Sequence, residues 1–370
     1  MTDTTATHRL DRIRAQLEPA GARALLLAAG EDVRYAVGYT PPGDERVSFL
    51  VVGATGAALV VPGVNATDVR LRLGHLPVLD YADDEGPQRR LHEALELATG
   101  SAAGGGTLLL SDKTRHDHVL KVGDALRPDE VSLASRVLRP LRMIKDADEL
   151  DRLRAASHIA DQVFLVGARA VTRGATERDV QAAMLQAFRA AEGDGPSGQL
   201  VAYGANTAAP HHQPDDTVLA DGPLWLDLGC RKDGYWSDLT RCVYVGTPTD
   251  RYREIFAIVD EARQAGQDAV AVGAPASAVD RSARAVIERA GYGPYFVHRT
   301  GHGIGLEGHE PPFMMRGDET PLAVGMTFSI EPGIYLPGEF GVRIEDVVAV
   351  TRDGAEVLPA LSHRWIEVDR

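Results

Sequence analysis

The stretch LWLDLGCRKDGYWSDLTRCVYVG, Leu224 to Gly246, decides how the C-terminal half of the chain folds. Two apolar, strand-like runs flank a polar turn that contains glycine, which is the pattern of a β-hairpin. If Arg231 to Gly234 form the loop, Asp227 and Asp238 lie directly opposite each other. Directly opposed side chains in a hairpin point to the same face, with Cβ atoms about 5 Å apart.

This close approach of two carboxylates has a chemical consequence. Carboxylates that are buried side by side repel each other, and burying them costs free energy unless protons or cations compensate their charge. The hairpin therefore predicts a bound metal ion.

A second acidic pair follows in FSIEPGIYLPGEFGVRIEDVVAV, Phe328 to Val350, where a turn centred on Gly338 places Glu331 opposite Glu345. This register is idealised, and a β-bulge would shift it. In a site for two cations, one carboxylate bridges ions that lie roughly 3.5 to 4 Å apart while others hold one ion each. Two acidic pairs on two hairpins therefore predict a two-cation site.

Between the hairpins lies HRTGHGIGLEGHEPP, in which His298, His302 and His309 alternate with glycines. So many glycines argue against a regular helix and favour a loop that approaches other backbone closely. A single histidine on a loop is usually only solvated. Three of them between two acidic hairpins favour an imidazole metal ligand with proton-handling neighbours.

The C-terminal half thus carries five potential metal ligands in a fixed order: Asp227, Asp238, His302, Glu331 and Glu345. Together with the motifs SDLTR, TGHGIGLEGHE, EPGIY and GVRIED, this order resembles the pita-bread metallopeptidases. That family includes methionine aminopeptidase, aminopeptidase P and prolidase, and also the non-metal enzyme creatinase. The resemblance covers about residues 145–365.

The N-terminal part, from Arg23 to Asp112, alternates short apolar runs with helical patterns and reads as a small α/β domain. Its VRYAVGY segment, Val33 to Tyr39, resembles the extra domain of the aminopeptidase P, prolidase and creatinase branch. We therefore expect an α+β protein with an N-terminal creatinase/prolidase-like domain over residues 1–143. A pita-bread catalytic domain is expected over residues 144–370.

The resemblance also implies roles for the five ligands. Asp238 and Glu345 would bridge two divalent ions, and Asp227 would chelate one of them. His302 and Glu331 would complete the other, with Glu331 also acting as proton shuttle for a metal-activated water. Manganese is the expected metal, although cobalt and zinc suit the same ligands.

Four further residues are implied to line the site. His298 would help to hold the substrate, His309 would stabilise the developing oxyanion, and a histidine of the PHHQPDD segment would also line the pocket. We assign the last role to His211, but the segment is one residue shorter than usual, so His212 remains an alternative. Arg343 resembles an arginine that orients the acidic ligands; the alternative is a plain surface ion pair.

The resemblance implies an exopeptidase that removes an N-terminal residue in front of proline. A prolidase accepts only dipeptides and needs a cation for their C-terminal carboxylate, whereas aminopeptidase P accepts longer peptides. Some prolidases carry an arginine just after their HE-x-P motif, where this chain has Phe313. Arg316 or a residue of the N-terminal domain is the alternative source of that cation.

Two other functions fit the same fold. One is a creatinase-like amidinohydrolase, which works without metal and does not keep this carboxylate set. The other is a binding protein that has lost catalysis, and such relatives have typically lost ligands. The intact set of five argues against both.

The composition sets the wider limits. The chain has 370 residues, of which 44% are hydrophobic and 25% charged, and its formal charge of -14 argues against nucleic acid as a partner. No leader-like start and no run of about 18 apolar residues is present, so we expect neither secretion nor membrane insertion. With only Cys230 and Cys242, a reducing cytoplasm is the expected location. The resemblance implies short proline-containing peptides as partners and a homodimer.

Overall fold

The computed structural model describes residues 3–101, 103–194 and 198–369 and divides into two units, Met1–Arg142 and Met143–Arg370. Both units combine helices with β-sheets, as the sequence predicts. Within the described residues, no helix combines the length and the apolar character needed to cross a membrane.

The first unit is a mixed sheet with helices packed against it. The sheet has the order β4-β3-β2-β1-β5-β6, and its strands β1, β2, β3 and β5 lie in the short apolar runs of the sequence. One core cluster includes Leu26, Phe49 and Val60 from the sheet and Leu91 and Leu95 from a helix. The elements of this unit are α1 (Asp3–Leu17), β1 (Ala22–Ala28), α2 (Glu31–Val37), β2 (Phe49–Gly53), β3 (Ala57–Pro62), α3 (Gly63–Leu73), β4 (Val78–Tyr81), α4 (Gln88–Thr99), β5 (Thr107–Leu110), α5 (His116–Leu126), β6 (Glu130–Leu133) and α6 (Ser135–Met143).

The second unit holds the predicted ligands. Its elements run in the order α7 (Ala147–Ala170), α8 (Glu177–Ala190), β7 (Gly198–Tyr203), η1 (Gly204–Ala208), β8 (Gly222–Gly229), β9 (Arg231–Lys232), β10 (Tyr235–Trp236), β11 (Leu239–Val245), α9 (Asp250–Asp268), α10 (Ala276–Arg289), η2 (Gly293–Tyr295), β12 (Gly301–Gly303), β13 (Glu310–Met314), β14 (Thr327–Ile330), β15 (Gly333–Tyr335), β16 (Gly341–Arg343), β17 (Asp346–Thr351), β18 (Gly354–Val357) and β19 (Ile366–Val368).

Two helices of this unit begin with a capping box. Asp146 and Glu149 form one at the start of α7, and Thr176 and Asp179 form one at the start of α8. Each box satisfies backbone N–H groups that the first turn of a helix leaves free. The apolar faces of α7 and α8 then pack with one face of the sheet β19-β11-β8-β7.

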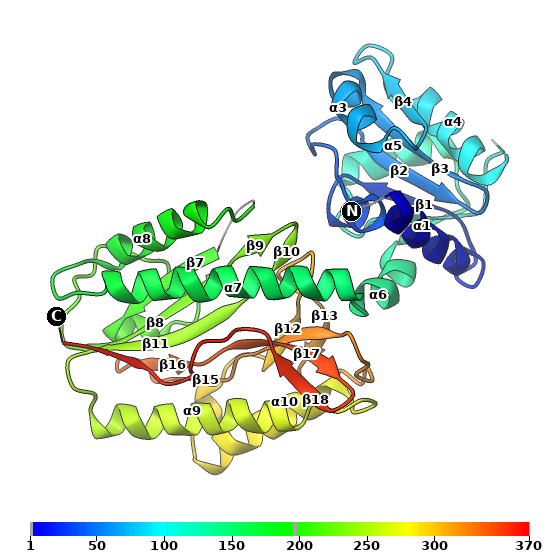
Figure 1. The fold of residues 1–370 in the computed structure, drawn as a ribbon. Helices are drawn as coiled ribbons and strands as arrows, with labels where there is room; N and C mark the ends of the chain where they lie inside the picture. Colours follow the sequence, from blue (N-terminus) through cyan, green and yellow to red (C-terminus); the bar gives the residue numbers. More distant parts are fainter. Residues whose placement is uncertain (1–2, 102, 195–197, 370) are drawn as a thin grey trace. The chain divides into compact units, whose positions relative to one another are not determined.

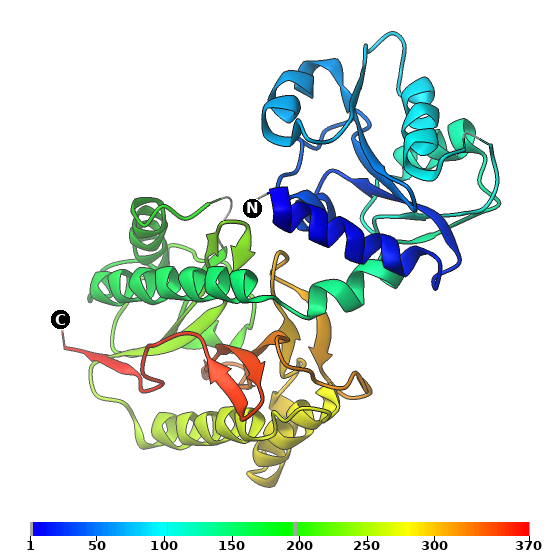
Figure 2. The same cartoon turned by 45° about the vertical axis from the view of Figure 1, so that its right-hand side comes forward.

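The opposite face of that sheet belongs to a second core. Trp225 and Cys242 point away from α7 and join a cluster with residues of α9, α10 and β16. A further sheet, β13-β12-β14-β17-β18, contributes Phe328 and Ile330 to a third cluster, which also contains residues of α10. Figures 1 and 2 show α7 and α9 on opposite sides of the strands of this unit.

The register predicted for the first hairpin is wrong by two residues. Thr240, and not Asp238, lies opposite Asp227. The loop contains only Asp233 and Gly234, with φ of 50° and 86°. Positive φ at both positions is what a two-residue type I′ turn requires, and Asp-Gly favours it. Because side chains alternate with a period of two, a shift by two residues leaves Asp238 on the same face as Asp227.

The register predicted for the second hairpin is confirmed. Gly333 pairs with Arg343 in β15 and β16, and Ile330 pairs with Asp346 in β14 and β17. Glu331 and Glu345 lie between these pairs, opposite each other. Gly338 is at the turn with a φ of 79°, a backbone conformation that glycine adopts without steric cost.

Three apolar runs that read as continuous strands in the sequence, 235–246, 327–335 and 342–350, are interrupted. The first breaks at Ser237 and Asp238, the second at Glu331 and Pro332, and the third at Ile344. Proline has no N–H to give to a ladder, which accounts for the second break. At two of the breaks the acidic residue pairs with another segment: the Glu331 N–H donates to the Thr300 carbonyl at 2.8 Å, and the Glu345 N–H donates to the Thr240 carbonyl at 3.1 Å.

Candidate functional site

Three carboxylates from separate segments form the first ligand group. Oxygens of Asp227, Asp238 and Glu345 all lie within 4.8 Å of one another. Thr240 fixes the position of Glu345, because its Oγ1 donates a hydrogen bond of 2.7 Å to Glu345 Oε2 and its carbonyl accepts one of 3.1 Å from the Glu345 N–H. Thr240, which lies opposite Asp227, therefore holds the carboxylate of Glu345 close to that of Asp227.

A second ligand group shares Glu345 with the first. It comprises His302, Glu331 and Glu345, again with ligand atoms within 4.8 Å. His302 Nε2 lies 3.3 Å from Glu331 Oε1 and 3.7 Å from Asp238 Oδ2. Its Nδ1 lies 3.1 Å from the carbonyl oxygen of Gly303, which can only accept, so Nδ1 carries a proton. In the neutral ring, Nε2 is then left as a metal-ligating nitrogen.

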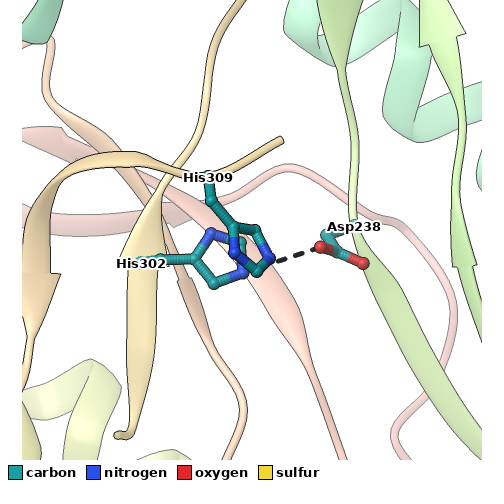
Figure 3. Close-up of side chains that lie close together, drawn as sticks. All are labelled: Asp238, His302 and His309. Carbon is teal, nitrogen blue, oxygen red and sulfur yellow. Dashed lines mark ion pairs between the residues drawn. The ribbon is translucent and has the colours of Figure 1, made fainter. Parts of the chain in front are cut away.

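His309 joins the same region from the segment after β12. It forms a third group with Asp238 and His302, and the rings of His302 and His309 lie 3.8 Å apart between centroids. Figure 3 shows the two imidazoles, which are tilted by 38° relative to each other, beside Asp238, with the ion pair between His302 and Asp238 dashed.

Burial and the close approach of these acids shift their pKa values. Burial, followed by the charge of Asp227, raises the pKa of Asp238 to about 8. Burial and the charge of Asp238 likewise raise the pKa of Glu345 well above its ordinary value. Burial also raises the pKa of Glu331, but the hydrogen bond and charge of His302 outweigh it and bring the value down to about 2.

Glu345 also has an oxygen in need of a partner. Its Oε1 is buried and accepts no hydrogen bond from any residue that the structure describes. A buried acceptor without a partner is costly, and a divalent cation both satisfies it and replaces the protons that the carboxylates would otherwise hold. The set of carboxylates with one imidazole fits divalent cations by ligand type.

Arg343 lies directly behind the first group, with a side chain only 3% exposed. It forms an ion pair with Asp227 and donates to Thr240 Oγ1 at 3.1 Å and to the Tyr335 hydroxyl at 2.8 Å. Its guanidinium also lies 4.5 Å from the centre of the Trp225 ring. These buried contacts are not those of a surface ion pair, which was the alternative interpretation.

His298 lies outside the ligand groups and is joined to Arg343 through Tyr335. Its Nε2 lies 2.9 Å from the Tyr335 hydroxyl, and its Nδ1 lies 2.7 Å from the carbonyl of Arg299. Burial lowers the pKa of His298, so the ring is neutral near pH 7. Sequence reasoning did not single out Tyr335, although it belongs to the EPGIY motif.

The structure separates the two histidines of the PHHQPDD segment. The ring of His212 donates from Nε2 to Glu177 Oε2 at 2.7 Å, whereas the side chain of His211 is exposed. Burial raises the pKa of Asp227, and the charge of His211 is among those that oppose this rise. The same charge contributes to the lowered pKa of His309, after burial and the charges of His302 and Arg299. His211 follows Pro210, whose carbonyl accepts a hydrogen bond of 3.2 Å from Arg343, the partner of Asp227.

Arg299 is a cation beside this site that sequence reasoning missed. Its Nη2 lies 3.3 Å from His309 Nδ1, and its guanidinium carbon lies 4.5 Å from the centre of the Phe313 ring. Arg316, the cation that the sequence offered, is exposed and lines a depression with Ser277 and Glu319. The only sequence signal for Arg299 is its position next to His298.

The two cysteines pack in cores. Cys230 and Cys242 are free and buried, and burial raises the pKa of the Cys230 thiol to about 12 and that of Cys242 to about 11. Thiols with such pKa values carry almost no thiolate near pH 7 and are poor nucleophiles.

Comparison with known proteins identifies a family for both domains. Residues 151–352 match the model of metallopeptidase family M24, and residues 9–144 match the creatinase/prolidase N-terminal domain. Dipeptidase PepE from Mycobacterium ulcerans has a similar structure, with a TM-score of 0.91, 36% identity and full coverage of both chains. A prolidase from Thermococcus sibiricus has a TM-score of 0.90 and 32% identity, also with full coverage of both chains.

A curated relative points to the same family. The Xaa-Pro dipeptidase of Lactobacillus delbrueckii subsp. lactis is 34% identical over 93% of this chain and 95% of its own length. These similarities confirm the expected architecture, an N-terminal creatinase/prolidase-like domain followed by a pita-bread domain. Family membership also implies divalent cations, for which the ligand groups provide the residues. The chain belongs to metallopeptidase family M24.

Proposed function

We propose that the protein is a dinuclear-metal Xaa-Pro dipeptidase, which hydrolyses the bond between an N-terminal residue and proline. The observation that carries this proposal is the pair of ligand groups that share Glu345, one with Asp227 and Asp238 and one with His302 and Glu331. A shared carboxylate between two sets of terminal ligands is the arrangement that two neighbouring cations need. The Xaa-Pro dipeptidase and prolidase relatives support the substrate.

The proposed ligand assignment follows the two groups. Asp238 and Glu345 would hold both cations, Asp227 would complete the ligands of one, and His302 and Glu331 would complete those of the other. The distance of 3.7 Å between Asp238 and His302 supports the bridging role of Asp238, because it brings an acid of the first group next to the imidazole of the second. Arg343 orients Asp227 through their ion pair.

The cations, when bound, supply an activated water nucleophile and polarise the scissile carbonyl. Glu331 accepts the proton of that water and passes it to the leaving proline nitrogen. Burial, with the charge of His302, lowers the pKa of His309 to about 4, so its ring is neutral near pH 7. Because Arg299 donates to Nδ1, the proton of that neutral ring lies on Nε2 and is available to the developing oxyanion.

The remaining pocket residues hold the substrate in this proposal. Tyr335 and the Arg299 carbonyl fix the ring of His298, and the exposed His211 follows Pro210, whose carbonyl is bonded to Arg343. Short proline-containing peptides are the proposed partners. We further propose manganese as the native metal, with cobalt or zinc as alternatives, and a cytoplasmic homodimer.

Arg299 supports dipeptides over longer peptides. A dipeptide differs from a longer peptide by its free carboxylate next to the proline ring, and a site that selects it needs a cation beside an apolar surface. Arg299 and Phe313 together offer both, next to His309. In the part of the chain that the structure describes, no carboxylate pairs with Arg299, so the guanidinium is available to an anion.

The test is mass spectrometry of the products from Ala-Pro and Ala-Pro-Ala, incubated with manganese-loaded protein and with a chelated control. We expect cleavage of Ala-Pro, little cleavage of Ala-Pro-Ala and no cleavage after chelation. Efficient release of alanine from the tripeptide would make the protein an aminopeptidase P instead. Cleavage of neither peptide, or cleavage that survives chelation, would overturn the proposal.

A further inference from the structure

A cluster outside the ligand groups contains Glu177, His212 and Asp215, with side-chain ligand atoms within 4.8 Å of one another. Glu177 is the first residue of α8 and is completely buried. Its Oε1 accepts from the Tyr203 N–H at 2.7 Å and from Asn206 Nδ2 at 3.1 Å. Its Oε2 accepts from His212 Nε2 at 2.7 Å and from the Asp215 N–H at 3.0 Å.

These four hydrogen bonds decide what the cluster does. An ionised carboxylate has about four acceptor positions on its two oxygens, and here all of them are filled by protein donors. Glu177 therefore has no lone pair left for a cation. Its partners instead come from the beginning, the middle and the end of the segment 203–215, so that one buried carboxylate ties most of the connection between β7 and β8 to α8.

The same segment is also tied from the other side. Arg343 donates from Nη1 to the Pro210 carbonyl at 3.2 Å, and the Gly341 N–H donates to Thr207 Oγ1 at 2.8 Å. Pro210 is thus held by the residue that pairs with Asp227, and His212 is held by Glu177. The residue between them is His211.

His211 itself is left free by this arrangement. Its side chain is exposed, and no hydrogen bond or ion pair of its imidazole occurs in the described residues. The residue before it, Pro210, is bonded to Arg343, which pairs with Asp227, so His211 follows directly on a residue held beside the first ligand group. Both neighbours in the chain are fixed while the ring between them is open to a substrate.

We infer that Glu177 and His212 are positioning residues, which act on the reaction by holding His211 over the metal site. This inference rests on the proposed function, because it takes His211 as a substrate-contacting residue. A displacement of about 1 Å in such a residue can lower the rate roughly 100-fold. The hydrogen bond between Glu177 and His212 can therefore affect the rate although neither residue is a proposed metal ligand.

The experiment compares His212→Ala, His211→Ala and the double variant, by kcat and KM for Ala-Pro. We expect each single variant to lose about 10- to 100-fold in kcat/KM. The double variant should be no worse than His211→Ala alone, because His212 acts only through His211. His212→Gln should recover most activity, since its amide N–H can donate to Glu177. His158→Ala is the matched control, because His158 is an exposed histidine that bonds Gln162 and lies on α7.

Hydrogen exchange of segment 203–215 gives a readout that does not depend on activity. Exchange there should be faster in His212→Ala and unchanged in His158→Ala. Glu177→Gln replaces one accepting oxygen of a buried carboxylate by an NH2 group and is expected to destabilise the fold. The test therefore uses His212→Ala and His212→Gln.

The outcomes separate this inference from the proposed function. The inference is wrong, while the proposed peptidase activity stands, if kcat/KM of His212→Ala stays within twofold of wild type or if the exchange of the segment is unchanged. It is also wrong if adding His212→Ala to His211→Ala lowers kcat/KM by the same factor as it does in the wild type. If the wild-type protein cleaves no Xaa-Pro peptide, the proposed function fails and the role given to His211 fails with it. Faster exchange in the segment would then support only the mechanical clamp.

Discussion

Glu345 is the residue on which the two ligand groups converge, and its position is determined from several directions. Thr240 bonds both its carboxylate and its backbone N–H, and Arg241 donates to its carbonyl. Its second carboxylate oxygen is buried without a partner in the described residues. A ligand that is fixed before the metal binds loses little freedom on binding, which favours a defined coordination geometry.

Glu331→Gln tests the proton transfer proposed for Glu331. The amide keeps the size of the side chain but cannot accept a proton from water, and general acid–base groups contribute about 100- to 10,000-fold to rates. We expect kcat for Ala-Pro to fall by about 100-fold or more, with KM changed far less. Metal content is measured alongside, so that loss of a cation is recognised. Glu339→Gln, an exposed change near the turn of the same hairpin, is the control; full activity of Glu331→Gln would refute the assignment.

Arg299→Gln tests how the site recognises a free carboxylate. We compare kcat/KM for Ala-Pro with that for its amide, Ala-Pro-NH2, which lacks the negative charge. A charge-assisted hydrogen bond contributes about 1.5 to 3 kcal/mol, so the preference for the free acid should fall by about 10- to 100-fold. Arg316→Gln should keep the wild-type preference, because Arg316 lies in the depression with Ser277 and Glu319. If wild type and Arg299→Gln prefer Ala-Pro over Ala-Pro-NH2 equally, another group binds the substrate carboxylate.

At the scale of the elements, the ligands come from hairpins that the sequence could predict and from breaks that it could not. The turn around Gly338 sets the second register, so Glu331 and Glu345 were correctly placed opposite each other. The first register was wrong because the two-residue Asp-Gly turn was taken as a longer loop. The error did not separate Asp227 from Asp238, since a shift of two residues preserves the face of the sheet.

Contacts between elements far apart in sequence were the part that could not be predicted. Thr176 and Asp179 cap α8 through local contacts, but nothing in the sequence indicates that the intervening Glu177 holds a segment some 30 residues later. Arg299 was hidden in the same way, because its partners Phe313 and His309 belong to a later segment. Local patterns predict the elements, whereas the packing of elements decides which side chains meet.

At the scale of the whole molecule, the buried acids make the stability of the metal-free protein depend on pH. A group whose pKa is higher in the folded than in the unfolded state stabilises the fold at low pH and loses that effect as the pH rises. Asp238, with a pKa of about 8 in the folded state, is such a group, and Glu345 and His302 shift in the same direction. His298 and His309 shift the opposite way, but these rings are largely neutral in both states above pH 7.

Between pH 7 and pH 8 the raised groups should therefore dominate. We expect the chelated protein to unfold at a lower temperature at pH 8 than at pH 7, with a slope of up to about 1.4 kcal/mol per pH unit for each fully shifted proton. Manganese should abolish this loss, because coordination requires the ionised carboxylates and strengthens as the pH rises. Thermal unfolding with and without manganese measures both effects, and Asp238→Asn should flatten the slope of the chelated protein. A chelated wild-type protein that is equally stable at pH 7 and pH 8 would mean that the acids do not hold their protons in the folded state.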